Sequence, residues 1–179
     1  MSSSVRKTAA ALASGDAAAE SQREFAFSDA DFRSLAQYAY EQAGIVLGES
    51  KRNLVYSRLS RRLRVLGLNA FREYREYLAN TASELESFVN AISTNLTKFF
   101  RESHHFDHFR TNVAGTYAGS GGGRLRIWSA GCSTGEEPYT IGVVLHREVP
   151  DAGRRDVRIL ATDIDTEVIG KGARAEYAA

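Results

Sequence analysis

The sequence predicts an α/β protein in which an all-helical domain precedes the first part of a Rossmann-like domain. Apolar residues recur at helical spacing from Ser28 to about Asn112, which predicts the helical part. Beyond a glycine-rich interruption, two short β-prone runs flank a helical stretch, which is the order of a parallel βαβ unit. With 179 residues, 43% of them apolar and 25% charged, the chain can fold as one ordinary domain or two small ones.

Capping residues at the breaks between segments predict where the helices of the first half begin and end. Ser28 with Asp31 can cap a first helix, and Gly44 can end it in the left-handed conformation. Ser50 can cap a second helix, which Gly67 ends. Further starts are expected at Asn69, at Ser83 with Glu86, and at Ser103.

The stretch of residues 114–123 predicts a flexible linker, because the run from Gly119 to Gly123 is all glycine except for Ser120. The expected domain limits follow from it. They are a disordered tail at 1–26, a helical domain at 27–113, the linker at 114–123 and the α/β part at 124–179.

The α/β part contains two expected strands, at residues 125–128 and 157–162. A helix around residues 139–149 connects them, and another is expected at 166–175. Trp128 is expected in the core of the first strand. Two parallel strands do not form a stable sheet by themselves, so we expect the chain to be the front part of a longer protein, truncated at its C-terminal side.

Composition excludes several classes of protein. The net charge of +1 gives the whole chain no preference for nucleic acid or membrane surfaces. Its one cysteine, Cys132, excludes an internal disulfide and fits a reducing compartment. No stretch reaches the roughly 18 consecutive apolar residues of a transmembrane helix, so we expect a cytoplasmic monomer that does not insert into the membrane.

A glycine turn with two carboxylates follows the first expected strand. Gly131 and Gly135 let backbone approach a ligand closely, but Glu136 and Glu137 come next, where a dinucleotide site would hold a phosphate. Asp163 ends the second strand, where a carboxylate usually binds a ribose diol. A ligand that carries a ribose and has little negative charge, or a positive one, fits both features, and S-adenosylmethionine is such a ligand. The alternative is that the two glutamates only complement a helix dipole.

Three segments go beyond these general features: residues 95–101 (NLTKFFR), 129–140 (SAGCSTGEEPYT) and 161–167 (ATDIDTE). Together they closely resemble the chemotaxis receptor methyltransferase family, CheR. Residues 43–47 (AGIVL) and 58–64 (RLSRRLR) are similar to its N-terminal domain, and the match covers about residues 27–179. The resemblance implies methylation of glutamate side chains on the cytoplasmic helices of chemoreceptors, with S-adenosylmethionine as cofactor and S-adenosylhomocysteine as product.

The same resemblance implies roles for individual residues. Asn95, Thr97 and Arg101 match motif positions that approach the cofactor. Glu137 matches a further cofactor ligand, and Asp163 the residue that binds the ribose. Arg101 is also the candidate catalytic residue, holding either the acceptor carboxylate or the methionine carboxylate of the cofactor. A glutamate acceptor, with a pKa of about 4.3, is already ionised near neutral pH, so neither a general base nor a metal is expected.

A basic segment in the expected second helix is the candidate receptor-docking surface. Residues 51–66 contain no acidic residue, and Arg58, Arg61 and Arg62 share a helix face, with Arg64 nearby. The alternatives are an ordinary solvated face and a nucleic-acid surface, which the near-neutral charge disfavours. Because the family's later strands are missing, a non-catalytic receptor-binding or cofactor-sensing module is the alternative function.

Two other features carry weaker signals. His104 and His108 have the spacing of helical zinc ligands, but no third ligand is near them in sequence, so no metal site is expected. Cys132 lies in the ligand turn without an adjacent base, and a need for a small residue explains it better than a nucleophile does.

Overall fold

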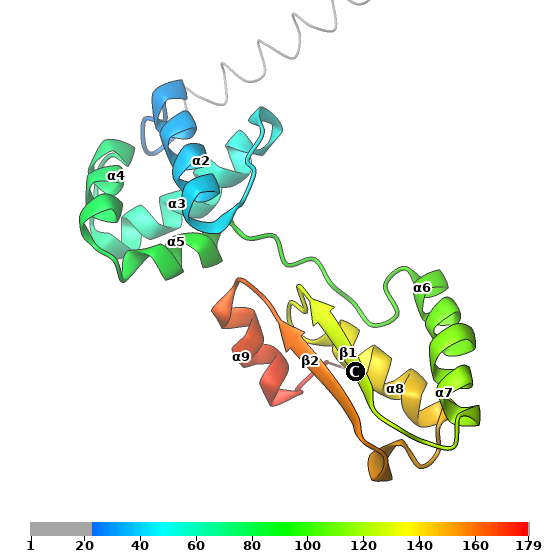
Figure 1. The fold of residues 1–179 in the computed structure, drawn as a ribbon. Coiled ribbons are helices and arrows are strands. Elements are labelled where there is room, and N and C mark those ends of the chain that lie inside the picture. Colours follow the sequence, from blue (N-terminus) through cyan, green and yellow to red (C-terminus); the bar gives the residue numbers. More distant parts are fainter. Residues whose placement is uncertain (1–22, 179) are drawn as a thin grey trace, which may run out of the picture. The chain divides into compact units, whose positions relative to one another are not determined.

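A computed structural model describes residues 23–178, which divide into two compact units with the boundary between Ile92 and Ser93. The first unit is all-helical and the second contains the parallel strands (Figure 1), so the predicted fold class is confirmed.

The first unit is built from short helices that enclose one apolar core. Its elements are α2 (Asp29–Ala43), the 3₁₀ turn η1 (Glu49–Lys51), α3 (Arg52–Leu66), α4 (Phe71–Asn80) and α5 (Glu84–Ile92). Buried residues from α2, α3, α4 and α5 meet in the core, among them Phe32, Leu35, Val55, Leu59, Leu63, Phe71, Tyr74 and Phe88.

Three of the predicted helix ends are confirmed. The Ser28 hydroxyl accepts the amide of Asp31 at 3.1 Å, while the Asp31 carboxylate accepts the amide of Ser28 at 3.1 Å, which is a complete capping box. Gly44 and Gly67 end α2 and α3 with φ values of 67° and 68°. Both lie in the left-handed region, which glycine adopts without steric cost.

Two predicted helix starts are wrong. Ser50 lies inside η1, and α3 begins at Arg52 without a side-chain cap. Asn69 does not cap α4 either, because the N-cap position falls at Ala70. Instead, the Asn69 amide donates to the Glu73 carboxylate at 2.9 Å, so the carboxylate in the first turn of α4 holds the residue just before the N-cap against the helix.

The expected tail limit is also corrected. Phe25, expected in a disordered tail at 1–26, is only 8% exposed and belongs to the core of the first unit. Its ring meets Phe71 edge to face, with the centroids 6.5 Å apart. The rest of the expected tail, residues 1–22, lies outside the described residues.

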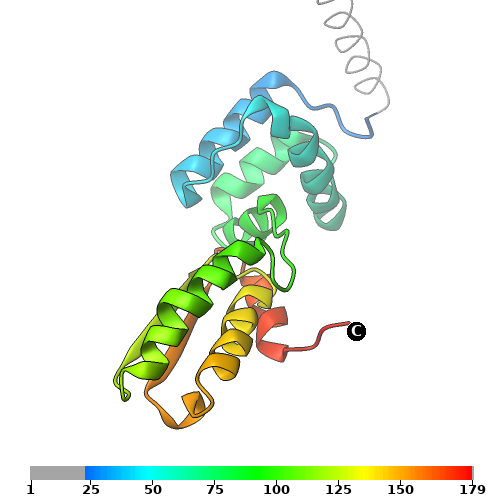
Figure 2. The ribbon, with the colours of Figure 1, turned by 90° about the vertical axis from the view of Figure 1, so that its right-hand side faces the viewer.

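After a loop that starts at Ser93, the second unit continues with a helical rod. The sequence had predicted part of this rod in the helical domain and part in a flexible linker. The rod runs without a break through α6 (Ser103–His108), the π-helical turn η2 (Phe109–Ala114) and α7 (Gly115–Gly119). After it come β1 (Leu125–Ala130), α8 (Glu136–Glu148), the 3₁₀ turn η3 (Ala152–Arg154), β2 (Val157–Thr162) and α9 (Thr166–Arg174). Figure 2 shows the rod and α8 side by side.

The expected boundary at residues 114–123 is therefore misplaced, and part of that stretch is helical. Tyr117 is buried against α8, in a cluster with Ala114 and Leu145. Its hydroxyl donates to the carbonyl of Gly123 at 2.7 Å. This packing offsets the low helix propensity of the glycines. The local sequence shows the glycines but not the packing, and so it predicted a flexible linker.

The two strands pair in parallel and in register, from Leu125 opposite Val157 to Ala130 opposite Thr162. Side chains alternate between the two faces of a sheet, and Ile127 and Ile159 face the cluster formed with α8. Trp128 consequently points to the other face and is 67% exposed, which corrects its expected place in the core. No helix within residues 23–178 is long and apolar enough to cross a membrane.

Candidate functional site

The candidate site of the second unit forms where β1 and β2 end side by side. The amides of Gly131 and Cys132 both donate to the carbonyl of Thr162, at 2.8 and 2.9 Å, so the chain leaves β1 by turning across the end of β2. Ligands of open parallel sheets bind at this edge.

The glycine turn is held from the C-terminal side of the chain by Tyr177. The Tyr177 hydroxyl donates to the carbonyl of Thr134 at 2.8 Å, and its ring meets those of Phe99 and Tyr139 edge to face. Burial, followed by the charge of Glu136, raises the pKa of Tyr177, so the hydroxyl keeps its proton and remains a donor at neutral pH. Nothing local in the sequence indicated this residue.

Gly135 is the tightest point of the turn. Its φ is 99°, and a Cβ placed there would lie 2.6 Å from the Tyr177 hydroxyl and 3.1 Å from the Cα of Gly172. We expect Gly135→Ala to lower the free energy of unfolding by about 1–3 kcal/mol, because the left-handed backbone and the contact both become strained.

The matched control for Gly135→Ala is Gly142→Ala inside α8, the helix that Gly135 precedes. Gly142 has a helical backbone, and an added Cβ would meet nothing within 4 Å. This control should be neutral or stabilise the protein by about 0.5–1 kcal/mol in thermal unfolding. Equal effects of the two substitutions would contradict the tight packing at Gly135.

The two glutamates after the turn lie in the first turn of α8 and each accepts a local hydroxyl. Ser129 donates to Glu137 at 2.6 Å, and Thr134 donates to Glu136 at 2.6 Å. Their negative charge is favourable at this helix end, so the dipole interpretation keeps its support. Glu137 is bonded to the buried Ser129 of β1 and stands at the strand end, whereas Glu136 bonds within the turn itself.

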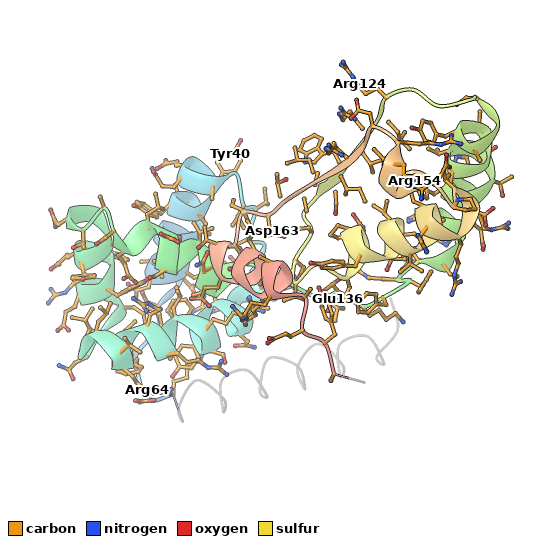
Figure 3. The ribbon with its side chains drawn as sticks, turned by 90° about the horizontal axis from the view of Figure 1, so that it is seen from below. Tyr40, Arg64, Arg124, Glu136, Arg154 and Asp163 are labelled. Carbon is orange, nitrogen blue, oxygen red and sulfur yellow. The ribbon has the colours of Figure 1, made fainter. Side chains whose placement is uncertain are left out.

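Asp163 faces the glycine turn from the end of β2 (Figure 3). One carboxylate oxygen accepts the amide of Ser133 at 2.7 Å, and the other accepts the amide of Asp165 at 2.9 Å. Each ionised carboxylate oxygen can accept two hydrogen bonds, so one acceptor position per oxygen remains for a ligand diol. Asp163 therefore keeps acceptor positions while it holds the turn in place.

Cys132 lies in this turn as a buried thiol. It is 4% exposed, and burial, followed by the charge of Asp163, raises its pKa above the ordinary range. A thiol that stays protonated at neutral pH is a poor nucleophile. The structure therefore supports the interpretation of Cys132 as a small residue in a tight turn.

The segment that carries Asn95, Thr97 and Arg101 forms a loop before α6. Thr97 and Arg101 line one cavity of about 630 Å³, together with Lys98 and His104. An Arg101 guanidinium N–H donates to the carbonyl of Leu96 at 3.0 Å, which ties the side chain back onto its own loop. Glu102 also lines this cavity, so the cavity carries the cationic groups of Lys98 and Arg101 beside one carboxylate.

Arg101 stands between two residues with unusual backbone conformations. Phe100 and Glu102 have φ values of 54° and 56°, although neither is glycine. Such angles cost free energy and persist where the surroundings impose them, often at functional sites. One such constraint is the Phe100 amide, which donates to the Thr140 hydroxyl of α8 at 3.3 Å.

Asn95 does not line that cavity, and its side chain is turned toward the strand ends. Its side-chain amide donates to the Asp165 carboxylate at 2.5 Å, and its backbone carbonyl accepts the Ser133 hydroxyl at 3.3 Å. The structure thus connects Asn95 with Ser133 and Asp163 at the strand ends. Asp165 was missed by the sequence analysis, although its place two residues after Asp163 and just before a helix is a usual capping signal.

The candidate docking arginines lie on α3 in the first unit, and two of them have acidic partners. Arg62 pairs with the buried Glu84 of α5 at 2.7 Å, and Arg64 pairs with Glu24 at 2.7 Å. The sequence analysis looked for acidic residues on the same helix and so missed both pairs. Arg58 donates to the carbonyl of Ala91 at 3.3 Å. Arg61 is exposed and forms no ion pair with any residue from 23 to 178.

The histidines of α6 are exposed. His104 lies 3.9 Å from the Glu102 carboxylate, and both side chains are open to solvent. In residues 23–178 no three potential ligands of the His, Cys, Asp and Glu types gather to hold a metal ion.

Comparison with known families accounts for both units. Residues 30–93 match the CheR methyltransferase, all-alpha domain, and residues 95–179 match the CheR methyltransferase, SAM binding domain. The chain belongs to the CheR methyltransferase family. The two CheR domains meet where the structure divides, between Ile92 and Asn95, and the loop with Thr97 and Arg101 falls in the S-adenosylmethionine-binding domain.

Named relatives are similar across most of the chain. It is 46% identical to the chemotaxis protein methyltransferase of Salmonella typhimurium, over 87% of this chain and 52% of the relative. It is 45% identical to the Escherichia coli chemotaxis protein methyltransferase, over 85% of this chain and 52% of the relative. The chemotaxis protein methyltransferase 2 of Pseudomonas aeruginosa is 45% identical, with 87% and 54% covered. The chain spans about half the length of the curated CheR relatives that it matches.

Proposed function

We propose that this chain is part of a cytoplasmic, monomeric enzyme that methylates glutamate side chains on the cytoplasmic helices of chemoreceptors. S-Adenosylmethionine is the methyl donor, glutamate methyl esters and S-adenosylhomocysteine are the products, and the esters serve chemotactic adaptation. The observation that carries the proposal is Asp163 at the end of β2, facing a glycine turn that presents carboxylates where a nucleotide phosphate would otherwise lie.

The residues at the strand ends fit the cofactor. Asp163 has one acceptor position per oxygen left for the ribose hydroxyls. Glu137, held by Ser129, adds negative charge that suits a cationic sulfonium compound and repels a pyrophosphate. Gly131 leaves β1 without a side chain, so the ligand can approach the backbone closely. When bound, S-adenosylmethionine supplies an electrophilic methyl group.

The chemistry requires positioning and no proton transfer. The acceptor glutamate is ionised near neutral pH. One of its oxygens would attack the electrophilic methyl group, so the residues of this chain would need only to hold that oxygen in line. Arg101, with Lys98 on the same cavity, can hold the acceptor carboxylate in line. Such orientation contributes roughly 7–11 kcal/mol to rate acceleration in favourable cases.

The decisive experiment is transfer of a radiolabelled methyl group to a purified receptor cytoplasmic fragment. A methyl ester releases its label as methanol in base, whereas methyl groups on nitrogen remain. Label that is released in base supports the proposal. S-Adenosylhomocysteine binding without transfer would support the alternative, a cofactor-sensing or receptor-binding module.

Receptor docking is proposed for the face of α3 that carries Arg58 and Arg61. We expect Arg61→Glu to weaken binding of an acidic receptor helix about tenfold, because a reversed charge at the rim of an interface removes attraction and adds repulsion. The difference from the unmodified chain should shrink as salt is added. Fluorescence anisotropy with a labelled receptor peptide measures both effects.

The matched control for Arg61→Glu is Arg33→Glu, a charge reversal at an exposed position of α2. It should leave receptor affinity within about twofold, as expected for a distant surface charge. S-Adenosylhomocysteine affinity should stay the same in both variants. A parallel loss of receptor and cofactor affinity in Arg61→Glu would mean that the arginine has a structural role.

A further inference from the structure

Asp165 is a buried carboxylate that the proposed chemistry does not use. It is 3% exposed, and it precedes α9. One of its oxygens caps the helix by accepting the amides of Glu167 at 3.0 Å and Val168 at 3.3 Å. The other accepts the side-chain amide of Asn95 at 2.5 Å. The carboxylate therefore serves two segments that lie 70 residues apart in the sequence.

The bond between Asn95 and Asp165 is one side of a closed ring of hydrogen bonds. The Asp165 amide donates to Asp163 at 2.9 Å, and Asp163 accepts the Ser133 amide at 2.7 Å. The Ser133 hydroxyl then donates to the carbonyl of Asn95 at 3.3 Å, which closes the ring. The ring joins the loop before α6, the glycine turn and the end of β2, which are the three segments of the candidate site.

Helix capping alone does not explain this arrangement. Asparagine, serine and aspartate all cap helices well with a single oxygen. The second oxygen of a buried carboxylate requires a donor of its own, and Asn95 supplies it from outside the helix. An aspartate at this position can cap α9 with one oxygen and accept the Asn95 amide with the other, which explains why a carboxylate stands here and not a neutral capping residue.

We propose that Asp165 is a positioning residue, which with Asn95 forms a clasp that fixes the loop of residues 95–102 to the start of α9, beside the glycine turn. The clasp, defined as the hydrogen bond between these two side chains, keeps the segment that carries Thr97 and Arg101 joined to the strand ends, where Asp163 lies. The part that concerns the ligand rests on the proposed S-adenosylmethionine site. The part that concerns the loop is a property of the chain itself.

The experiment compares Asp165→Asn with the reciprocal pair Asn95→Asp/Asp165→Asn. In Asp165→Asn the side-chain oxygen still caps α9, but the charge-assisted hydrogen bond to Asn95 is replaced by a contact between two neutral amides, which is weaker even when Asn95 turns its oxygen toward position 165. The double variant exchanges the two groups, so that a carboxylate at position 95 accepts from the amide at 165. Hydrogen exchange of residues 96–102 reports on the loop, and exchange of residues 168–172 reports on α9.

We expect Asp165→Asn to speed exchange in residues 96–102 about tenfold, with α9 unchanged, and to lower S-adenosylhomocysteine affinity about tenfold. The double variant should restore slow exchange in the loop. Loop exchange that stays at the original rate in Asp165→Asn would overturn the clasp, and so would equal loosening of the loop and α9. If the unmodified chain binds no S-adenosylhomocysteine while the exchange pattern appears as expected, the clasp stands and the proposed function fails.

Discussion

Replacement of Asp163 by alanine is expected to lower the affinity for S-adenosylhomocysteine by at least about 100-fold. Two hydrogen bonds from ribose hydroxyls to a carboxylate contribute roughly 1.5–3 kcal/mol each, and alanine removes both. The substitution also frees the amides of Ser133 and Asp165, which Asp163 now accepts at 2.7 and 2.9 Å. The turn therefore loosens at the same time as the ligand contact is lost.

Calorimetric titration of S-adenosylhomocysteine measures this loss, with thermal unfolding as the check on folding. Asp156→Ala is the matched control, because Asp156 precedes β2, at the end away from the site, and pairs with Arg126 in an exposed position. It should leave the affinity unchanged. Asp163→Asn keeps an acceptor for one backbone amide and should fold even if the alanine variant does not. Affinity within about threefold of the unmodified chain in both Asp163 variants would refute the assignment of the ribose site.

The sequence predicted those parts of the fold that local chemistry determines. The capping box of Ser28 and Asp31 needs only neighbouring residues, and the left-handed ends at Gly44 and Gly67 need only a residue without Cβ. The βαβ order follows from periodicity, and its handed, parallel connection follows from chain geometry. These features are readable from short windows.

The predictions that failed depend on contacts between distant segments. Trp128 belongs to an alternating strand, but alternation does not say which face the helices cover. The domain boundary was set at the glycines because the burial of Tyr117 against α8 cannot be read from its neighbours. The ion pair of Arg62 was not foreseen either, because its partner, Glu84, lies 22 residues away on another helix.

In the candidate site, too, features set by the local sequence were predicted and contacts between distant segments were not. Asp163 and the glycine turn were predicted because strand ends in parallel sheets have a known chemistry. Their connection through Ser133 and Asn95 was not, since hydrogen bonds over 30 and 38 residues leave no local pattern. Resemblance to the CheR family indicated Asn95, whereas only the structure connects it to Asp165.

Removal of the Arg62 side-chain charge is expected to have the largest effect on stability. Glu84 is 4% exposed, and its carboxylate accepts two N–H groups of Arg62, at 2.9 and 2.7 Å, and the Tyr74 hydroxyl at 3.0 Å. Burial, followed by the charge of Glu84, raises the pKa of Tyr74, so the hydroxyl remains a donor at any physiological pH. Among residues 23–178, Arg62→Met leaves the Glu84 carboxylate with the Tyr74 hydroxyl as its one remaining side-chain partner.

A buried carboxylate that loses its cation costs about 3–5 kcal/mol of folding free energy, and we expect Arg62→Met to fall near the lower limit because the arginine is partly exposed. Urea unfolding monitored by circular dichroism measures the change. The matched control is Arg64→Met on the same helix, where arginine and glutamate are both half exposed and solvent already screens the pair. Its unfolding midpoint should barely move.

A double variant separates the lost ion pair from lost packing. In Arg62→Met/Glu84→Gln the buried group is neutral, and the glutamine oxygen can still accept the Tyr74 hydroxyl. The double variant should therefore regain at least about 1 kcal/mol relative to Arg62→Met, because the cost lies in an unpaired charge. If it is no more stable than the single variant, the arginine acts through the packing of its stem, and Arg62 becomes a candidate for the docking face again.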